Sequence, residues 1–178
     1  MKKLFAIVTL LATLMVANIA DAKFSDEYRT KYPKRVKVEK SIDPNGKPSK
    51  MTTYTLFKNE IGAGWLLLQV FDNDGLKLCS VAYGETLSTP KDYSHFSWGD
   101  GEKKHEIRRL VSYYERKGRD RFHNFMNATI QPSDLKKAVV LSAHYNGYYS
   151  DPIIHSSHKQ WNEFMEALDV AERLIKER

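Results

Sequence analysis

Cysteine is almost absent from this chain of 178 residues, in which Cys79 is the only one. An intramolecular disulfide is therefore excluded, and packing must hold the fold together even in an oxidising compartment. Cys79 lies in "LKLCSVAY", among strand-forming residues, and this setting favours a small buried apolar side chain over a nucleophile. No cysteine stands at the start of the predicted mature chain, which excludes a lipid anchor there.

Motifs for several common chemistries are missing as well. No serine occupies a strand-to-helix nucleophile turn, and Gly62 and Gly64 in "GAG" lack the remaining spacing of a phosphate-binding loop. The "DNDG" segment resembles part of a calcium loop, but Val70 stands where a ligand is needed and no closing glutamate follows. Acidic residues lie on predicted solvated faces or turns, which argues against a glycosidase pair. The sequence therefore favours a protein that is not an enzyme.

A long apolar run occurs once, at residues 4–17, after the basic start "MKK" and before the small residues Ala20 and Ala22. This arrangement predicts a secretory signal peptide over residues 1–22. The run is shorter than the roughly 20 apolar residues that span a membrane. We expect a mature chain, 23–178, without a transmembrane anchor and located in the bacterial periplasm or secreted.

The charge balance is modestly basic. The precursor has 28 basic and 22 acidic residues, and loss of Lys2, Lys3 and Asp21 with the signal peptide leaves a net charge of +5. Such a balance favours a partner that is an acidic protein or an anionic component of the cell envelope. Nucleic acid is not expected as a partner outside the cytoplasm. The sequence does not indicate an oligomeric state.

Two hairpins are predicted in the first half of the mature chain. Residues 35–42 and 50–57 flank the turn formers Asn45-Gly46, and residues 65–71 and 76–83 flank "DNDG". The second pair is apolar on both alternating sets of positions, so we expect it to be central in a sheet. A further strand is predicted over residues 138–145, whereas residues 84–101 are predicted to form a loop.

Helical spacing appears in three places. In residues 102–118, Ile107, Leu110, Val111 and Tyr114 form one stripe, and a second short helix is predicted around residues 122–126. The C-terminal segment has the longest stripe, made of Trp161, Phe164, Met165, Leu168, Ala171 and Ile175.

These elements predict one α+β domain over residues 23–178. Its antiparallel sheet would have about five strands built from hairpins. Two or three helices would pack on the sheet, including the C-terminal amphipathic helix. Residues 23–33 are predicted to form an N-terminal arm.

The main functional hypothesis is a non-catalytic binding protein that inhibits or neutralises an envelope or secreted partner. Its predicted contact surface combines loop aromatics with basic residues of the following helix. The predicted partner-binding residues are Tyr93, Phe96, Trp98, His105, Arg109 and Arg116. The aromatic side chains could equally fill the core, and the helix face could be an ordinary solvated one.

The alternative hypothesis is a small extracytoplasmic metal-binding protein or metal-dependent enzyme. The segment "AHYNGYYSDPIIHSSHKQW" is rich in histidine, and imidazole suits zinc and copper. The predicted ligands are His144, Asp151, His155 and His158. Turn signals and a helix start explain most of this segment, so the main hypothesis involves no cofactor. A third hypothesis is a structural or stress-associated envelope component.

Overall fold

The computed structural model describes residues 37–42, 45–61, 64–108, 110–145 and 149–176. Residues 37–178 form one compact unit. The predicted signal peptide and the predicted arm lie outside the described residues. None of the described helices is long and apolar enough to cross a membrane.

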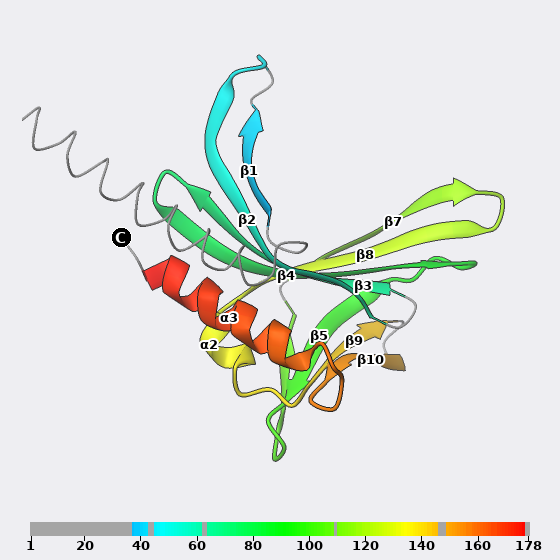
Figure 1. Ribbon diagram of the computed structural model, residues 1–178. Helices are drawn as coiled ribbons and strands as arrows, with labels where there is room; N and C mark the ends of the chain where they lie inside the picture. The colour runs from blue at the N-terminus through cyan, green and yellow to red at the C-terminus, as the bar shows by residue number, and fades with distance from the viewer. Residues whose placement is uncertain (1–36, 43–44, 62–63, 109, 146–148, 177–178) are drawn as a thin grey trace, which may run out of the picture. The chain divides into compact units, whose positions relative to one another are not determined.

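The larger sheet has six antiparallel strands in the order β1-β2-β3-β4-β8-β7 (Figure 1). Their bounds are β1 (Lys37–Ile42), β2 (Pro48–Ile61), β3 (Gly64–Asn73), β4 (Leu76–Leu87), β7 (Leu110–Gly118) and β8 (Arg121–Ile130). Both predicted hairpins are confirmed, as β1–β2 and β3–β4. At the β3–β4 turn Asp74 and Gly75 have φ values of 56° and 90°, as a tight hairpin turn requires.

The smaller sheet has four strands in the order β10-β9-β5-β6. Their bounds are β5 (Tyr93–Gly99), β6 (Lys104–Ile107), β9 (Val140–Tyr145) and β10 (Tyr149–His155). The strand predicted over residues 138–145 is confirmed as β9. The loop predicted over residues 84–101 is wrong, because it contains the end of β4 and all of β5.

Two helices are described, α2 (Pro132–Leu135) and α3 (Trp161–Lys176). The predicted C-terminal helix is confirmed as α3, which packs on β2, β3 and β4 and contacts α2. The ring of Phe164 meets that of Phe57 edge-on, with 5.3 Å between centroids. Burying an aromatic or aliphatic side chain of this size contributes about 1.5–3 kcal/mol. This layer of helix on sheet forms the main core.

The helix predicted over residues 102–118 is wrong, because this segment forms β6 and β7. Its β-branched and aromatic residues also suit a strand. Both Tyr113 and Tyr114 are exposed, so neither face of β7 is buried and no period-two pattern appears in the sequence. Pairing with β8 decides the conformation of this segment, and a local sequence pattern does not contain that pairing.

The short helix predicted around residues 122–126 is also wrong, because the segment lies in β8. Here the strand period is present in the sequence: Asn124, Met126, Ala128 and Ile130 are all buried, and the residues between them are more exposed. The coarse class, α+β, is confirmed. The expected five strands are too few, because the described residues form ten strands in two sheets.

On the face of the larger sheet that points away from the Leu66, Leu68 and Val70 side chains, Trp65 lies across Gly84. A β-carbon added at Gly84 would collide with the Trp65 ring, and its three nearest atoms all belong to that ring. The ring thereby reaches Phe125 on β8, with 5.8 Å between centroids. A side chain at position 84 would prevent this close approach.

Candidate functional site

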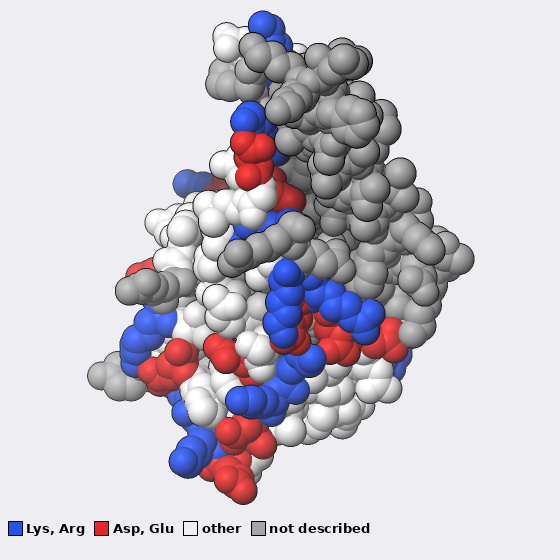
Figure 2. Space-filling view, turned by 90° about the vertical axis from the view of Figure 1, so that its left-hand side faces the viewer, with Lys and Arg blue, Asp and Glu red and all other residues white. Residues whose placement is uncertain are grey.

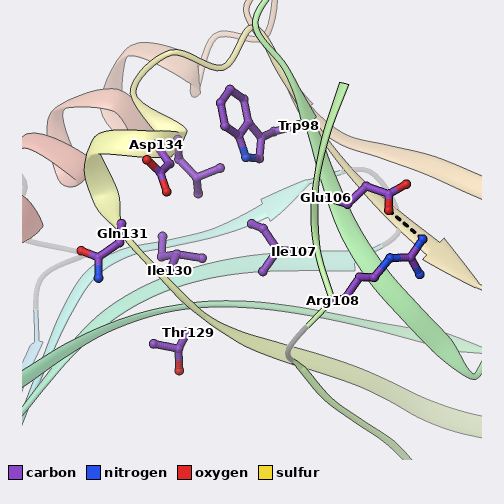
Figure 3. A pocket seen from close by; sticks show the side chains of 9 residues that line it. Trp98, Glu106, Ile107, Arg108, Thr129, Ile130, Gln131 and Asp134 are labelled. Atoms are coloured by element: carbon purple, nitrogen blue, oxygen red, sulfur yellow. Dashed lines mark ion pairs between the residues drawn. The ribbon is translucent and has the colours of Figure 1, made fainter. Parts of the chain in front are cut away.

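A cavity of about 310 Å³ lies where the smaller sheet meets the end of β8 and α2 (Figure 3). It is lined by Trp98, Glu106, Ile107, Arg108, Thr129, Ile130, Gln131, Asp134 and Leu135. Trp98 comes from β5 and Ile107 from β6, two neighbouring strands of one hairpin, and Ile130 comes from the end of β8 in the other sheet. Ligand pockets in proteins have volumes of about 300–1,000 Å³, and this cavity is at the lower limit.

Strand register brings the β5 and β6 side chains to this cavity. Trp98 pairs with His105 across the β5–β6 ladder, and their rings stack with 4.0 Å between centroids. Asp100 fixes the connecting turn, because its Oδ1 accepts hydrogen bonds from the backbone N–H groups of Glu102 and Lys103 at 2.9 and 2.7 Å. The orientation of the Trp98 ring is therefore set by a short, well-bonded hairpin.

The Asp100 carboxylate also contacts the His105 ring, with 2.9 Å between Oδ2 and Nε2. The backbone hydrogen bond from Lys103 and the contact with His105 lower the pKa of Asp100 far below its usual range. Asp100 is therefore ionised throughout the physiological range, and it holds the His105 ring against Trp98.

The cavity has an apolar wall and a charged rim. The wall consists of the buried Trp98, Ile130 and Leu135 with the half-buried Ile107. At the rim, the Glu106 and Arg108 side chains form an ion pair of 2.7 Å (Figure 3). Burial raises the pKa of Glu106, but Arg108 and the other nearby cations lower it by more. The cavity can therefore accept one apolar group beside an ionised rim.

The predicted partner-binding residues do not form one exposed surface. The side chains of Tyr93, Phe96 and Trp98 are buried, because β5 lies inside the core, and Trp98 reaches only the cavity wall. His105 is half-buried, and Arg116 is exposed on β7, away from the cavity. Arg109 lies outside the described residues. The role of these residues in binding stays a prediction.

A buried charged cluster joins the end of β4, the start of β5 and β10, and the sequence analysis missed it. Lys91 Nζ lies 2.8 Å from Glu85 Oε1 and 2.9 Å from Asp151 Oδ2. The ammonium also lies 3.7 Å from the centre of the Tyr145 ring. Burial lowers the pKa of Lys91, but its hydrogen bonds with Glu85 and Asp151 raise it by more. Lys91 is therefore a charged structural lysine and not a nucleophilic amine.

Two tyrosines complete this cluster. The Tyr93 hydroxyl donates a hydrogen bond to Glu85 Oε1, and the Tyr83 hydroxyl lies 3.4 Å from Glu85 Oε2. Burial and the Glu85 carboxylate raise the pKa of both phenols, so both remain protonated. Asn124 holds the segment in place, because its Oδ1 accepts a 2.6 Å hydrogen bond from the Lys91 backbone N–H. Buried and more exposed side chains alternate along β8, and Asn124 lies on its buried face. That alternation is the pattern in the sequence that could have identified Asn124 as a buried polar residue.

A histidine pair lies on the other side of β5. The rings of His95 and His144 stack with 4.1 Å between centroids and 8° between planes. Ser97 Oγ lies 2.6 Å from His144 Nε2. Burial, followed by the neighbouring His95 ring and by Lys104, lowers the pKa of His144, and burial also lowers that of His95. Both rings are therefore neutral at neutral pH, and the Ser97 hydroxyl can donate to His144.

This serine–histidine contact lacks the other parts of a catalytic site. Ser97 is buried in the middle of a strand, where a substrate carbonyl cannot reach it. In the described part of the chain no carboxylate hydrogen-bonds to the His144 ring, so the third member of a triad is missing. The arrangement is that of a structural hydrogen bond.

The four predicted metal ligands are not gathered in one place. His144 stacks on His95, and Asp151 pairs with Lys91. His155 and His158 are exposed neighbours, with 6.3 Å between ring centroids. Among the described residues no group of three or more His, Cys, Asp and Glu side chains could hold a metal ion. Metal binding by these four residues stays a prediction without support from their placement.

Comparison with known proteins adds no assignment. Neither a family model, nor a curated protein, nor a solved structure matches this chain. Its function has to be argued from its own residues.

Proposed function

We propose that this chain is an exported, non-catalytic binding protein that inhibits or neutralises an envelope or secreted protein. The observation that carries the proposal is the cavity beside Trp98, with its apolar wall and its Glu106–Arg108 rim. A partner would insert one apolar side chain there, and its polar groups would pair with the rim. Interfaces commonly place an apolar anchor in such a pocket, surrounded by polar residues.

The charge distribution supports a local contact over a broad electrostatic one. On the face in Figure 2, the Lys and Arg side chains lie interleaved with Asp and Glu side chains. The ion pairs show the same mixing of charges, since Lys136 contacts both Asp169 and Glu172, at 2.6 and 2.9 Å. A uniform polyanion gains little from such a face, because attraction and repulsion largely cancel. A partner that fills a shaped pocket is favoured instead.

The proposal is tested by placing a charge in the cavity wall. Ile107→Glu should keep the fold, because Ile107 is only half-buried, and it should leave an apolar partner group facing a carboxylate. The matched control is Leu78→Glu, which changes an exposed apolar residue of β4. The wild type and both variants are used to capture partners from an envelope and secreted-protein extract, and the affinity for a stoichiometric partner is then measured by calorimetry.

We expect one stoichiometric protein on the wild type and on the control, and at least about tenfold weaker binding to Ile107→Glu. Equal affinity of the two folded variants would show that the cavity is not the contact. Absence of any stoichiometric partner would remove the proposed function itself.

A further inference from the structure

The two sheets have four edge strands, and three of them carry features that hinder pairing with another chain. β1 bears Lys37, Glu39 and Lys40, and its exposed Ile42 follows a register shift. β6 has four residues, two of them charged. β10 contains Pro152 and an irregular register. Charges, short length, proline and bulges are the known means by which proteins protect sheet edges.

β7 is the exception among these edges in its first half. It is nine residues long, and no strand among the described residues pairs with its outer side. Its charged residues, Glu115, Arg116 and Lys117, and its register shift all lie in its second half. Its first half exposes Val111, Tyr113 and Tyr114, at 64%, 55% and 55% of their surfaces. An apolar stretch of sheet edge without such protection marks a site where another chain can add a strand.

Both faces of this edge are equipped to hold side chains. Tyr113 stacks on Phe125 on one face, with 4.9 Å between centroids. Tyr114 meets Phe122 edge-on at 5.9 Å on the other face. Side chains of an added strand alternate between the two faces, so each set would find a tyrosine that a phenylalanine of β8 supports.

The far end of the β7–β8 hairpin adds a charge preference. Residues 115–121 contain four basic and two acidic residues. Arg116 donates hydrogen bonds to the carbonyls of Gly118 and Arg119 in its own turn, at 3.0 Å each. Arg116, Arg119 and Arg121 make no ion pair within the described part of the chain. Three uncompensated guanidinium groups favour acidic residues in whatever pairs with this end.

We propose that β7 binds an extended segment of a partner protein by antiparallel strand addition. The segment has acidic residues at its N-terminal end, beside Arg116 and Arg121, and apolar residues beside Val111, Tyr113 and Tyr114. This proposal rests on the proposed binding function and names a second contact for the same partner. A second copy of the chain is disfavoured, because antiparallel pairing of two β7 strands would set the first half of one strand, which has no acidic residue, beside the basic turn of the other.

The test uses a fluorescent synthetic peptide of about twelve residues, long enough to cover β7. Three acidic residues begin it, and alternating valine and threonine follow. Binding is measured by anisotropy, and amide hydrogen exchange is followed in residues 110–117. Two control peptides share its length: one has N-methyl groups on alternate residues, which removes the backbone donors of one edge, and one has lysine in place of the acidic residues.

We expect saturable binding, slower exchange in β7, and at least about tenfold weaker binding of both control peptides. In the protein, Val111→Lys should weaken binding about as much, because a charge then lies in the apolar first half of the edge. Leu76→Lys is the matched control, since Leu76 is 65% exposed but lies in β4, and it should bind the peptide like the wild type.

Three results would overturn the proposal. Equal binding of the N-methylated peptide would mean that backbone pairing is not involved, and unchanged exchange in β7 would place the peptide elsewhere. The third result is a dimer in analytical ultracentrifugation whose β7 amides are protected from exchange without peptide. It would mean that the β7 edge pairs with a second copy of the chain. Because Ile107→Glu tests the cavity separately, failure of the strand addition is distinguishable from failure of the proposed function.

Discussion

The two polar clusters on either side of β5 both bury ionisable side chains, but one keeps them charged and the other keeps them neutral. Around Lys91 the groups remain charged, and each charged atom has a partner: the ammonium contacts two carboxylates, and Glu85 accepts from two tyrosines. Around His95 and His144 the rings are neutral. The buried Nε2 of His95 has no hydrogen-bond partner, and the Glu106 carboxylate, 3.5 Å away, raises the pKa of the ring by less than burial lowers it. Close pairing lets a charge be buried, whereas burial without it favours the neutral ring.

The largest effect is expected when the charged cluster loses its cation. Lys91→Met leaves Glu85 buried next to two phenols with no positive charge, and removing one partner of a buried pair costs about 3–5 kcal/mol. The free energy of unfolding, measured by urea denaturation, should fall by that amount. The control Lys104→Met removes an exposed lysine 3.7 Å from Glu106 and should change stability by less than about 1 kcal/mol.

Neutralising the carboxylate should recover part of this loss. In Lys91→Met/Glu85→Gln the amide oxygen can still accept from Tyr93, and no buried charge is left unpaired. The double variant should therefore be more stable than Lys91→Met alone. If the two substitutions are additive, the cluster does not act as one unit.

A smaller effect is expected at the neutral cluster. Ser97→Ala removes the 2.6 Å contact with His144 Nε2, and a hydrogen bond of this kind contributes about 1 kcal/mol. Ser142→Ala is the control, because Ser142 pairs with Ser97 in the ladder and lies on the same face. Equal losses for the two variants in urea denaturation would show that Ser97 contributes by packing only.

The smallest effect is a dependence on pH. The pKa values of His95 and His144 lie below their ordinary value of 6.5, so the unfolded chain binds more protons than the folded one below that pH. Their contribution to stability is complete above pH 6.5 and is lost as the pH falls toward their folded pKa values.

Denaturation is compared between about pH 5 and pH 7.5 in the wild type and in His95→Gln/His144→Gln. The double variant should lose less stability on acidification than the wild type does. His155→Gln, which changes an exposed histidine, should behave like the wild type. If the stability of the double variant fell with pH as steeply as that of the wild type, His95 and His144 would not be the source of the pH dependence.

Some elements could be predicted from the local sequence and others could not, and the reason is how much of each element is buried. β3, β4 and α3 each bury at least one full face, so the spacing of their apolar residues is clear in the local sequence. These elements and the turn at Asp74-Gly75 were therefore predicted. β7 buries neither face, and the spacing of Ile107 at the end of β6 with Leu110, Val111 and Tyr114 in β7 fits a helix equally well. Only its pairing with β8 decides, and no window of local sequence contains that information.

The candidate site was less predictable than the fold. Trp98 was singled out for its aromatic loop, but the loop is strand β5, and the cavity needs Ile130 and Leu135 from about thirty residues further on. Lys91, Glu85 and Asp151 are ordinary surface types in the sequence. These three side chains come into contact because the two sheets join at the start of β5. The spacing of the three residues in the sequence does not predict this contact.

The Trp65 ring that lies across Gly84 limits the order in which this protein can change during evolution. Alanine in a strand interior is usually no worse than glycine, since glycine weakens strands. At position 84 alanine is harmful as long as tryptophan occupies position 65, because the two would overlap. Once residue 65 has become smaller, the same substitution turns beneficial. Substitutions at the two positions are therefore coupled: Trp65 must be replaced by a smaller residue before Gly84 can be replaced by alanine.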